Sequence, residues 1–311
     1  MRGRLAPSPS GDLHLGHARS FLLAWWQARA QGGEIVLRME DLDSERCVPG
    51  SEESILDDLR WLGIDWDGDV VRQSERLGLY EAALNQLDAA GHLYPCVCTR
   101  RELAQAASAP HPHSASQAAA DSDLGPYPGT CRDRFGNRDA AREATGRAAA
   151  WRMRVTPGVH SFQDGIRGAY SEDVASSVGD FPVTRKDGRA AYQLAVVVDD
   201  ADQGITHVLR GDDLLSSTLR QVQVQQALGL PCPRWFHVPL VLDPEGARLA
   251  KRHESFSLRR LRQADWTAAD VVYWVASSAG LPGGKRPFAG DWLDAFNLGS
   301  LPCSPVSAPV L

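Results

Sequence analysis

The first 33 residues constrain the fold most, because they predict a strand, a tight turn and a helix in immediate succession. Residues 4–6 read as a short strand, which the Pro- and Gly-rich residues 7–11 end. Residues 18–30 then carry apolar side chains at helical spacing, up to a glycine pair at 32 and 33. The intervening residues 14–17, HLGH, therefore begin the helix.

This helix start predicts a phosphate site. The first turn of a helix presents unpaired backbone N–H groups and a partial positive charge, and His14 and His17 would add donors for phosphate oxygens. Gly16 would let a flat base or ribose approach the backbone where a side chain would block it. Taken alone, two histidines at a helix start are more often ordinary loop residues. The rest of the chain decides between these interpretations.

Four segments resemble one family in the same order along about the first 255 residues. APSPSGDLHLGH resembles the HIGH signature of class I aminoacyl-tRNA synthetases, in the form used by the glutamyl branch. LRMEDLDSER resembles the strand and acidic turn of that branch, AYQLAVVVDDADQGITHVLRGDDLLSST its second nucleotide-fold half, and RLAKR its KMSKS loop. The resemblance implies an α/β protein with a Rossmann nucleotide-binding fold, a zinc-containing α+β insertion and a short helical C-terminal region.

Length and charge limit the organisation of the chain. Its 311 residues can bury a large core and are expected to divide into two or three domains. We expect the first half of the nucleotide-binding catalytic domain at 1–95, the zinc-containing insertion at 96–190, the second catalytic half at 191–255 and the helical region at 256–311. Because the net charge is −6, RNA would be contacted through a local basic patch rather than a global field.

The location of the protein follows from what the sequence lacks. No apolar run reaches the length needed to cross a membrane, and the Pro- and Ser-rich residues after Leu5 argue against a signal peptide. We therefore expect a cytoplasmic protein with no membrane partner, and a monomer.

Apolar patterns predict the remaining elements. Buried strands are expected at 34–39, 194–198, 205–209 and 236–242, the second of them as a strand of a parallel sheet. Helices are expected after a Ser51 cap, from Ser74 with a buried face of Leu77, Tyr80, Leu84 and Leu87, from Leu214, and over 267–279 with Thr267 and Asp270 as a capping box.

Three cysteines predict a metal site. Cys96, Cys98 and Cys131 provide three thiolates, whereas zinc takes four ligands in a tetrahedron. The family resemblance implies a CxC…YxxxC site with Tyr127 as the fourth ligand. Judged by ligand chemistry alone, His113 in the same loop is a better zinc ligand than a phenol and stays the alternative. Reduced cysteines without a metal stay the second, less favoured alternative.

Charge argues for glutamate as a substrate. Its two carboxylates need guanidinium groups and its ammonium needs a carboxylate, and strand-end positions of Arg4, Glu40 and Arg210 would bring such groups to one sheet edge. Tyr192 would complete the pocket. Taken singly, each of these residues is more often an exposed charge or a core residue. The resemblance assigns glutamate binding to Arg4, Leu5, Ala6, Pro7, Ser8, Glu40, Tyr192 and Arg210.

The KMSKS-like run RLAKR keeps one lysine of the family pattern. Arg248, Ala250 and Arg252 replace the first Lys and both Ser positions, but Lys251 remains and would neutralise charge on the departing pyrophosphate. The resemblance implies that His14, Gly16, His17 and Lys251 carry the chemistry, with His14, His17 and Lys251 on ATP. ATP would enter as its Mg²⁺ complex.

The acceptor of the activated glutamate is implied only by resemblance. The short chain, the CxC…YxxxC pattern and the degenerate RLAKR all resemble a queuosine-modifying paralogue within the glutamyl branch. That paralogue implies transfer to queuosine in the anticodon loop of tRNA(Asp). The alternatives are a minimal glutamyl-tRNA synthetase that charges the acceptor end, and an idle paralogue that binds nucleotide or RNA.

Overall fold

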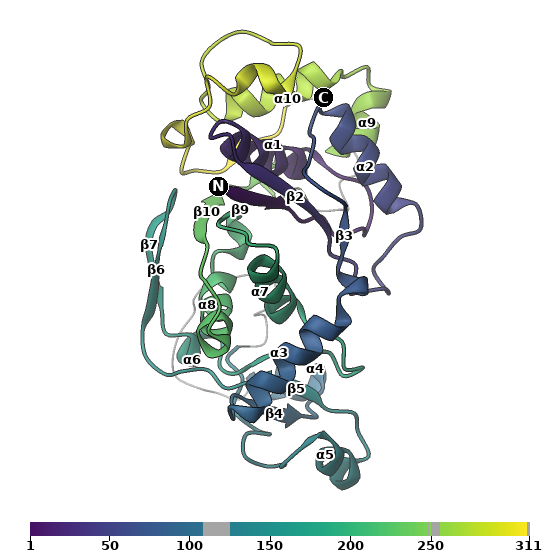
Figure 1. Cartoon of the computed structure of the whole chain (residues 1–311), viewed down its shortest axis with the longest axis vertical. Helices are drawn as coiled ribbons and strands as arrows, with labels where there is room; N and C mark the ends of the chain where they lie inside the picture. Colours follow the sequence, from purple (N-terminus) through teal and green to yellow (C-terminus); the bar gives the residue numbers. More distant parts are fainter. Residues whose placement is uncertain (108–124, 248, 250–255, 310–311) are drawn as a thin grey trace.

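A computed structural model describes residues 1–107, 125–247, 249 and 256–309, and Figure 1 shows the order of its elements along the chain. The helices, strands and 3₁₀ turns (η) are β1 (Arg2–Leu5), α1 (Leu15–Arg29), β2 (Glu34–Met39), α2 (Ser51–Trp61), β3 (Val71–Arg72), η1 (Gln73–Glu75), α3 (Leu77–Ala89), β4 (Leu93–Cys96), α4 (Arg100–Ala107), α5 (Arg138–Thr145), β5 (Ala150–Met153), β6 (His160–Asp164), β7 (Gly168–Glu172), α6 (Val174–Ser177), β8 (Phe181–Pro182), α7 (Tyr192–Asp202), β9 (His207–Gly211), η2 (Asp212–Leu214), α8 (Ser217–Leu228), β10 (Arg234–Val238), β11 (Val241–Leu242), α9 (Leu258–Gln263), α10 (Ala268–Ser278), η4 (Ala289–Trp292), η5 (Leu298–Ser300) and β12 (Val306–Ser307).

Two sheets meet edge to edge and form the α/β core. One has the order β1-β2-β3 and is parallel, and the other has the order β7-β6-β10-β9, with β6, β10 and β9 parallel. The Thr206 N–H donates to the Arg2 carbonyl at 2.9 Å and joins the start of β9 to β1. The carboxyl ends of β1, β2, β9 and β10 therefore lie along one edge, where open α/β sheets bind ligands.

The HLGH helix covers this core as expected. Helix α1 begins at Leu15 with His14 as its N-cap, and its buried side chains pack with those of α2, α9 and α10. Figure 1 shows α1 between the strands and the C-terminal helices. The predicted capping box of Thr267 and Asp270 begins α10. None of the described helices is both long and apolar enough to cross a membrane.

The apolar run at 194–198 is not a strand, so that prediction is wrong. It lies inside helix α7, which is buried from Gln193 to Asp200. A short apolar run is buried equally well in a sheet or in a helix that is covered on several sides, so its composition does not distinguish them. Helices α3, α7 and α8 pack together beside β9 and β10 (Figure 1).

Two expected helix starts are also displaced. Ser51 is the first residue of α2 rather than its cap, because its hydroxyl donates to the Gly11 carbonyl at 2.9 Å. Ser74 lies in η1, where its hydroxyl binds Asp41 at 2.6 Å, and α3 begins at Leu77. The Leu77 side chain is 50% exposed and does not join the buried face.

Two other predicted elements also have different bounds in the structure. Leu214 lies in η2 and α8 begins at Ser217. The run at 236–242 divides into β10 and β11 on either side of Pro239, since proline cannot donate a ladder hydrogen bond.

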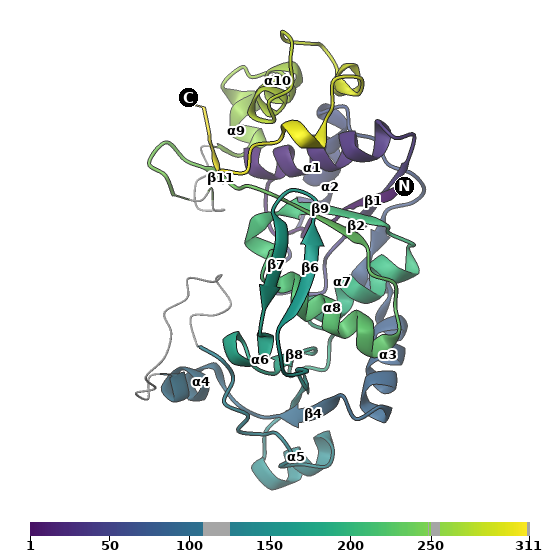
Figure 2. The same ribbon diagram turned by 90° about the vertical axis from the view of Figure 1, so that its left-hand side faces the viewer.

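The segment 96–190 contributes to two sheets. Strands β4, β5 and β8 form a separate antiparallel sheet, at the end of the molecule opposite α10. The hairpin of β6 and β7 instead reaches back to the α/β core, where Asp164 pairs with Trp235 of β10 (Figure 2). The residues expected as a single insertion therefore supply two strands to a sheet of that core.

Candidate active site

His14 and His17 cap the first turn of α1 reciprocally. The His14 Nδ1 accepts the N–H groups of Gly16 and His17 at 3.1 and 3.3 Å, and the His17 Nδ1 accepts the N–H of His14 at 3.3 Å. The two rings stack with their centroids 3.7 Å apart. Because Nδ1 is an acceptor in both rings, the proton of each neutral imidazole lies on Nε2. This nitrogen is a donor suited to a phosphate oxygen.

Gly16 also suits the position of the His14 ring. A Cβ at this position would lie 3.0 Å from His14 Cε1 and 3.1 Å from its Nδ1, so the ring would have to shift by a few tenths of an ångström to admit a side chain. The absence of a side chain was expected to admit a base or ribose. The structure adds that it also leaves room for the His14 ring.

Leu249, in the KMSKS-like run, and Ser257, five residues after it, both lie against this helix start. On one side, the Leu249 N–H donates to the Val241 carbonyl at 3.3 Å, and Val241 adjoins Gly16. On the other side, Ser257 forms a β-bridge with His14. Lys251, Arg248, Ala250 and Arg252 themselves lie outside the described residues.

Arg4 lies buried at the end of β1 among charged neighbours. Its Nη1 donates to the Leu209 carbonyl at 3.2 Å, and its Nε lies 3.6 Å from Asp200 Oδ1. Asp200 also receives Arg38 Nη2 at 2.9 Å. Burial lowers the pKa of Arg4, and Asp200 acts against this shift. The guanidinium is therefore held in place by groups on β9 and α7.

Glu40 and Tyr192 complete the same buried cluster. The Glu40 Oε1 lies 3.4 Å from Arg38 Nη2, and burial raises the pKa of Glu40 although Arg38 and Arg4 oppose the shift. Burial likewise raises the pKa of Tyr192. The nearby charges of Arg210 and Arg4 lower this pKa, and the charge of Glu40 raises it. Arg4, Glu40, Tyr192 and Arg210 thus come together at the sheet edge.

Arg210 is anchored on its inner side. Its Nε donates to His237 Nε2 at 3.0 Å and its Nη2 to Thr218 Oγ1 at 2.9 Å, while its guanidinium carbon lies 4.7 Å from the Trp235 ring centroid. Its Nη1 is buried and has no hydrogen-bond acceptor, and the same holds for Arg4 Nε. An unpaired buried donor is costly, so this cluster suits an anionic ligand.

The turn after β1 shapes the edge of this cluster. Leu5 is buried at the end of the strand, the Pro7 carbonyl accepts the Glu40 N–H at 2.9 Å, and Ser8 is exposed. Ala6 is half-buried. The backbone of this turn therefore fixes the position of Glu40.

Sequence reasoning missed several buried residues of the cluster. Arg38 is fully buried and binds Asp200 and Gln203, and Asp164 and His237 lie behind Arg210. An arginine inside the apolar run at 34–39 was a signal, because a buried charge needs partners. Asp200 was hidden by the misassigned strand at 194–198.

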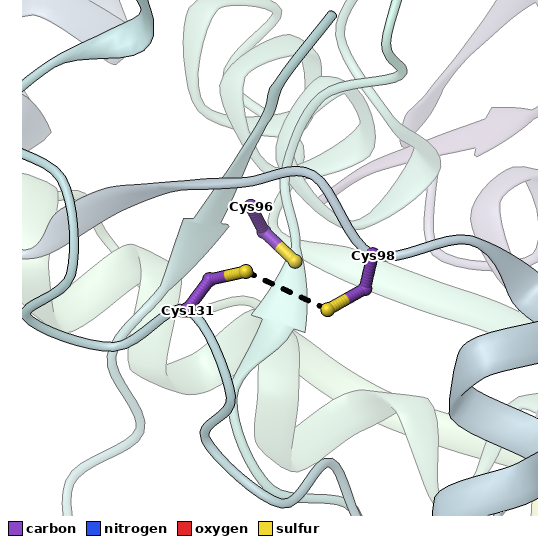
Figure 3. Close-up of side chains that lie close together, drawn as sticks. All are labelled: Cys96, Cys98 and Cys131. Atoms are coloured by element: carbon purple, nitrogen blue, oxygen red, sulfur yellow. Dashed lines mark hydrogen bonds between the residues drawn. The ribbon is translucent and has the colours of Figure 1, made fainter. Parts of the chain in front are cut away.

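Cys96, Cys98 and Cys131 converge although 33 residues separate the last two (Figure 3). Their sulfurs lie within 4.8 Å of one another, with Cys98 and Cys131 at 3.5 Å. The Tyr127 Oη lies 3.4 Å from Cys96 Sγ and 3.8 Å from Cys98 Sγ. Ligands bonded to one zinc at about 2.3 Å in a tetrahedron lie about 3.8 Å apart. These four atoms therefore fit one metal ion, and His113 lies outside the described residues.

Comparisons with known proteins agree with this architecture. Residues 1–276 match the family model of the catalytic domain of class I tRNA synthetases (E and Q). The chain is 49% identical to the glutamyl-Q tRNA(Asp) synthetase of Rhodopirellula baltica, over 89% of this chain and 84% of that protein. It is 46% identical to the protein of that name from Nitratidesulfovibrio vulgaris, over 99% of this chain and 96% of that protein.

Solved structures of glutamate-tRNA ligases share the fold. A crystal structure from Elizabethkingia meningosepticum, in complex with its amino acid, aligns with a TM-score of 0.80 and 26% identity, over 99% of this chain. The enzyme from Elizabethkingia anophelis aligns with a TM-score of 0.81 and 26% identity. The chain covers 66% and 68% of these two proteins, about two thirds of their length.

Proposed function

The chain belongs to the class I tRNA synthetases of the E and Q type, and on this basis we propose that it activates glutamate with ATP and transfers it to queuosine in tRNA(Asp). The enzyme is a ligase. In the first step an α-carboxylate oxygen of glutamate attacks the α-phosphorus of ATP, and pyrophosphate leaves. In the second step a hydroxyl of queuosine attacks the carbonyl carbon of glutamyl-adenylate, and AMP leaves.

The residues at the HLGH helix start act on ATP in this proposal. The Nε2–H groups of His14 and His17 donate to phosphate oxygens as negative charge grows there. Lys251, which the resemblance places in the KMSKS-like run, is assigned to the departing pyrophosphate, because Leu249 and Ser257 on its two sides lie beside this turn. ATP binds as its Mg²⁺ complex, in which the ion screens the phosphate charge.

The buried cluster at the sheet edge binds glutamate. Arg210 Nη1, a buried guanidinium donor without a hydrogen bond, is the observation that carries this assignment, because a carboxylate supplies the acceptor that it lacks. Arg4 Nε also makes no hydrogen bond, although Asp200 Oδ1 lies 3.6 Å from it. Glu40 provides the counter-charge for the ammonium group, and Tyr192 closes the pocket. Leu5, Ala6, Pro7 and Ser8 form the backbone wall of this pocket.

A zinc ion held by Cys96, Cys98, Tyr127 and Cys131 stabilises the fold between β4 and β5. The Cys131 N–H donates to Tyr127 Oη at 2.9 Å, and this bond holds the phenolic oxygen beside the sulfurs, 3.4 Å from Cys96 Sγ. The Arg152 guanidinium carbon lies 3.7 Å from the centroid of the Tyr127 ring and balances the negative charge of thiolate ligands. The role of the metal is structural because all four positions belong to the protein.

The zinc site predicts about one zinc per chain, the stoichiometry of a four-ligand site. Cys98→Ser should lose the metal and loosen residues 96–153, measured by elemental analysis and hydrogen exchange. Cys232→Ser is the matched control, because this cysteine is exposed and outside the cluster, and it should keep the zinc. Tyr127→Phe against His113→Ala decides the fourth ligand. Protein purified without chelator and free of zinc would reject the site.

The relatives support queuosine as the acceptor. The chain matches proteins named glutamyl-Q tRNA(Asp) synthetase at 44–49% identity, whereas it matches the glutamate-tRNA ligases at 26%. Queuosine carries a cyclopentene-diol, so its hydroxyl forms the same kind of ester as a ribose hydroxyl. An anticodon loop exposes its bases in a single strand, which a compact surface can bind.

Glutamate transfer is expected to require queuosine. Radioactive glutamate should join queuosine-containing tRNA(Asp) and not the queuosine-free transcript, because only the modified base offers the diol. The label should map to the first anticodon nucleotide after nuclease digestion. Equal labelling of both tRNAs, or label at the terminal adenosine, would favour a minimal glutamyl-tRNA synthetase. Absence of ATP–pyrophosphate exchange with glutamate would instead favour an idle paralogue.

A further inference from the structure

Three neighbouring strands bring Asp164, His237 and Arg210 into one buried row. They lie on β6, β10 and β9, and His237 is directly opposite Arg210 in the register of β10 and β9. The His237 Nδ1 lies 2.6 Å from Asp164 Oδ2, and its Nε2 accepts the Arg210 Nε–H at 3.0 Å. The side chains of Asp164 and His237 are fully buried.

The partners of His237 determine where its proton lies. A guanidinium can only donate, so His237 Nε2 must be the unprotonated nitrogen and Nδ1 must carry the hydrogen toward Asp164. Burial lowers the pKa of His237 to about 4, which keeps the ring neutral at pH 7. Burial would raise the pKa of Asp164, but the hydrogen bonds from His237 and from the N–H groups of Arg167 and Ile166 together hold that pKa below its usual value. The carboxylate therefore remains charged and fixes the Nδ1–H tautomer.

We propose that Asp164 and His237 are positioning residues that hold Arg210 in the orientation that receives a carboxylate of glutamate. The inference rests on the proposed function, in which Arg210 lines the glutamate pocket. With Nε held by His237 and Nη2 by Thr218, the Arg210 guanidinium cannot rotate without breaking both bonds. Its Nη1 is consequently left as the donor for the substrate.

Asp164→Asn tests this proposal because it reverses one hydrogen-bond direction with little change in shape. Asp164 Oδ1 accepts the N–H groups of Ile166, Arg167 and His237, so the amide oxygen of Asn takes this position. Its NH₂ group then faces His237 Nδ1 and donates to it. The imidazole proton must move to Nε2, where it opposes the Arg210 Nε–H. Arg210 is then expelled from its native orientation.

The expected result for Asp164→Asn is a rise of about 10- to 100-fold in the KM for glutamate in ATP–pyrophosphate exchange. The KM for ATP should stay within about twofold of the wild-type value, since the HLGH turn is untouched. Asp58→Asn is the matched control, because Asp58 is also buried but faces Arg262 at 3.0 Å. It should leave the KM for glutamate unchanged, whereas a general defect from a buried Asn would alter both variants alike.

Histidine ¹⁵N spectra provide a readout that is independent of activity. The His237 signal, assigned by its loss in His237→Gln, should show the proton on Nδ1 in the wild-type protein and on Nε2 in Asp164→Asn. A wild-type ring protonated on Nε2, or a variant with unchanged glutamate KM, would overturn the inference. Wild-type protein that performs no exchange with glutamate would instead reject the proposed function, and the spectra would still show whether the tautomer is set by Asp164.

Discussion

Arg4→Met is expected to reduce glutamate-dependent ATP–pyrophosphate exchange by at least about 100-fold in kcat/KM, as measured without tRNA. The guanidinium is buried, and its Nε makes no hydrogen bond but lies 3.6 Å from Asp200 Oδ1, whose charge it neutralises. The variant removes a donor for the substrate carboxylate and leaves surplus negative charge where that carboxylate must bind. Breaking a buried pair in this way costs about 3–5 kcal/mol.

Arg2→Met is the matched control for this prediction. Arg2 lies on the same strand and also pairs with a carboxylate, Glu34 at 3.3 Å, but its side chain is 44% exposed. Exposed ion pairs contribute little, so exchange should remain at the wild-type level. Thermal melting of both variants separates loss of binding from loss of fold. Exchange in Arg4→Met within about threefold of wild type, with the protein folded, would contradict the assignment of Arg4.

The start of the HLGH helix and the Thr267–Asp270 capping box were predictable because their signals are local. HLGH follows a Pro- and Gly-rich turn, and Thr267 stands three residues before Asp270, which is the spacing of a capping box. The reciprocal capping of His14 and His17 was not predicted. The strand at 34–39 was expected from a short apolar run between Gly33 and Glu40, and the structure has β2 there.

Long-range pairing could not be predicted from one sequence. Helix α7 contains five consecutive buried apolar residues, and only its packing against α3 and α8 distinguishes it from a strand. The partners Asp164 and His237 are 73 residues apart, and nothing local to either one indicates the other. The prediction of one shared site rested on the family resemblance and on the position of residues at strand ends. No feature of the sequence shows which of these side chains contact one another: Arg4, Glu40, Tyr192 and Arg210.

The HLGH turn leads to the second large effect. His17→Ala is expected to slow adenylate formation by roughly 30-fold or more, since one preorganised donor to developing phosphate charge contributes about 2 kcal/mol or more. Rapid-quench kinetics measures this step directly. Lys251→Ala should have a similar effect because its ammonium acts on the same phosphates. Glutamate binding, measured by calorimetry, should stay nearly unchanged in both variants.

His17→Ala also removes the acceptor of the His14 N–H, so a second variant must separate chemistry from capping. His17→Gln keeps an acceptor at the third helical position, where Gln completes a capping box, but lacks the imidazole Nε2–H. It should therefore retain the stability of α1 and still form the adenylate more slowly than the wild-type protein. His160→Ala, in the β6 and β7 hairpin, should change neither the stability of α1 nor the rate of adenylate formation. Wild-type adenylation rates in His17→Gln and Lys251→Ala would show that the histidine turn and the lysine are inherited features without a role in the reaction.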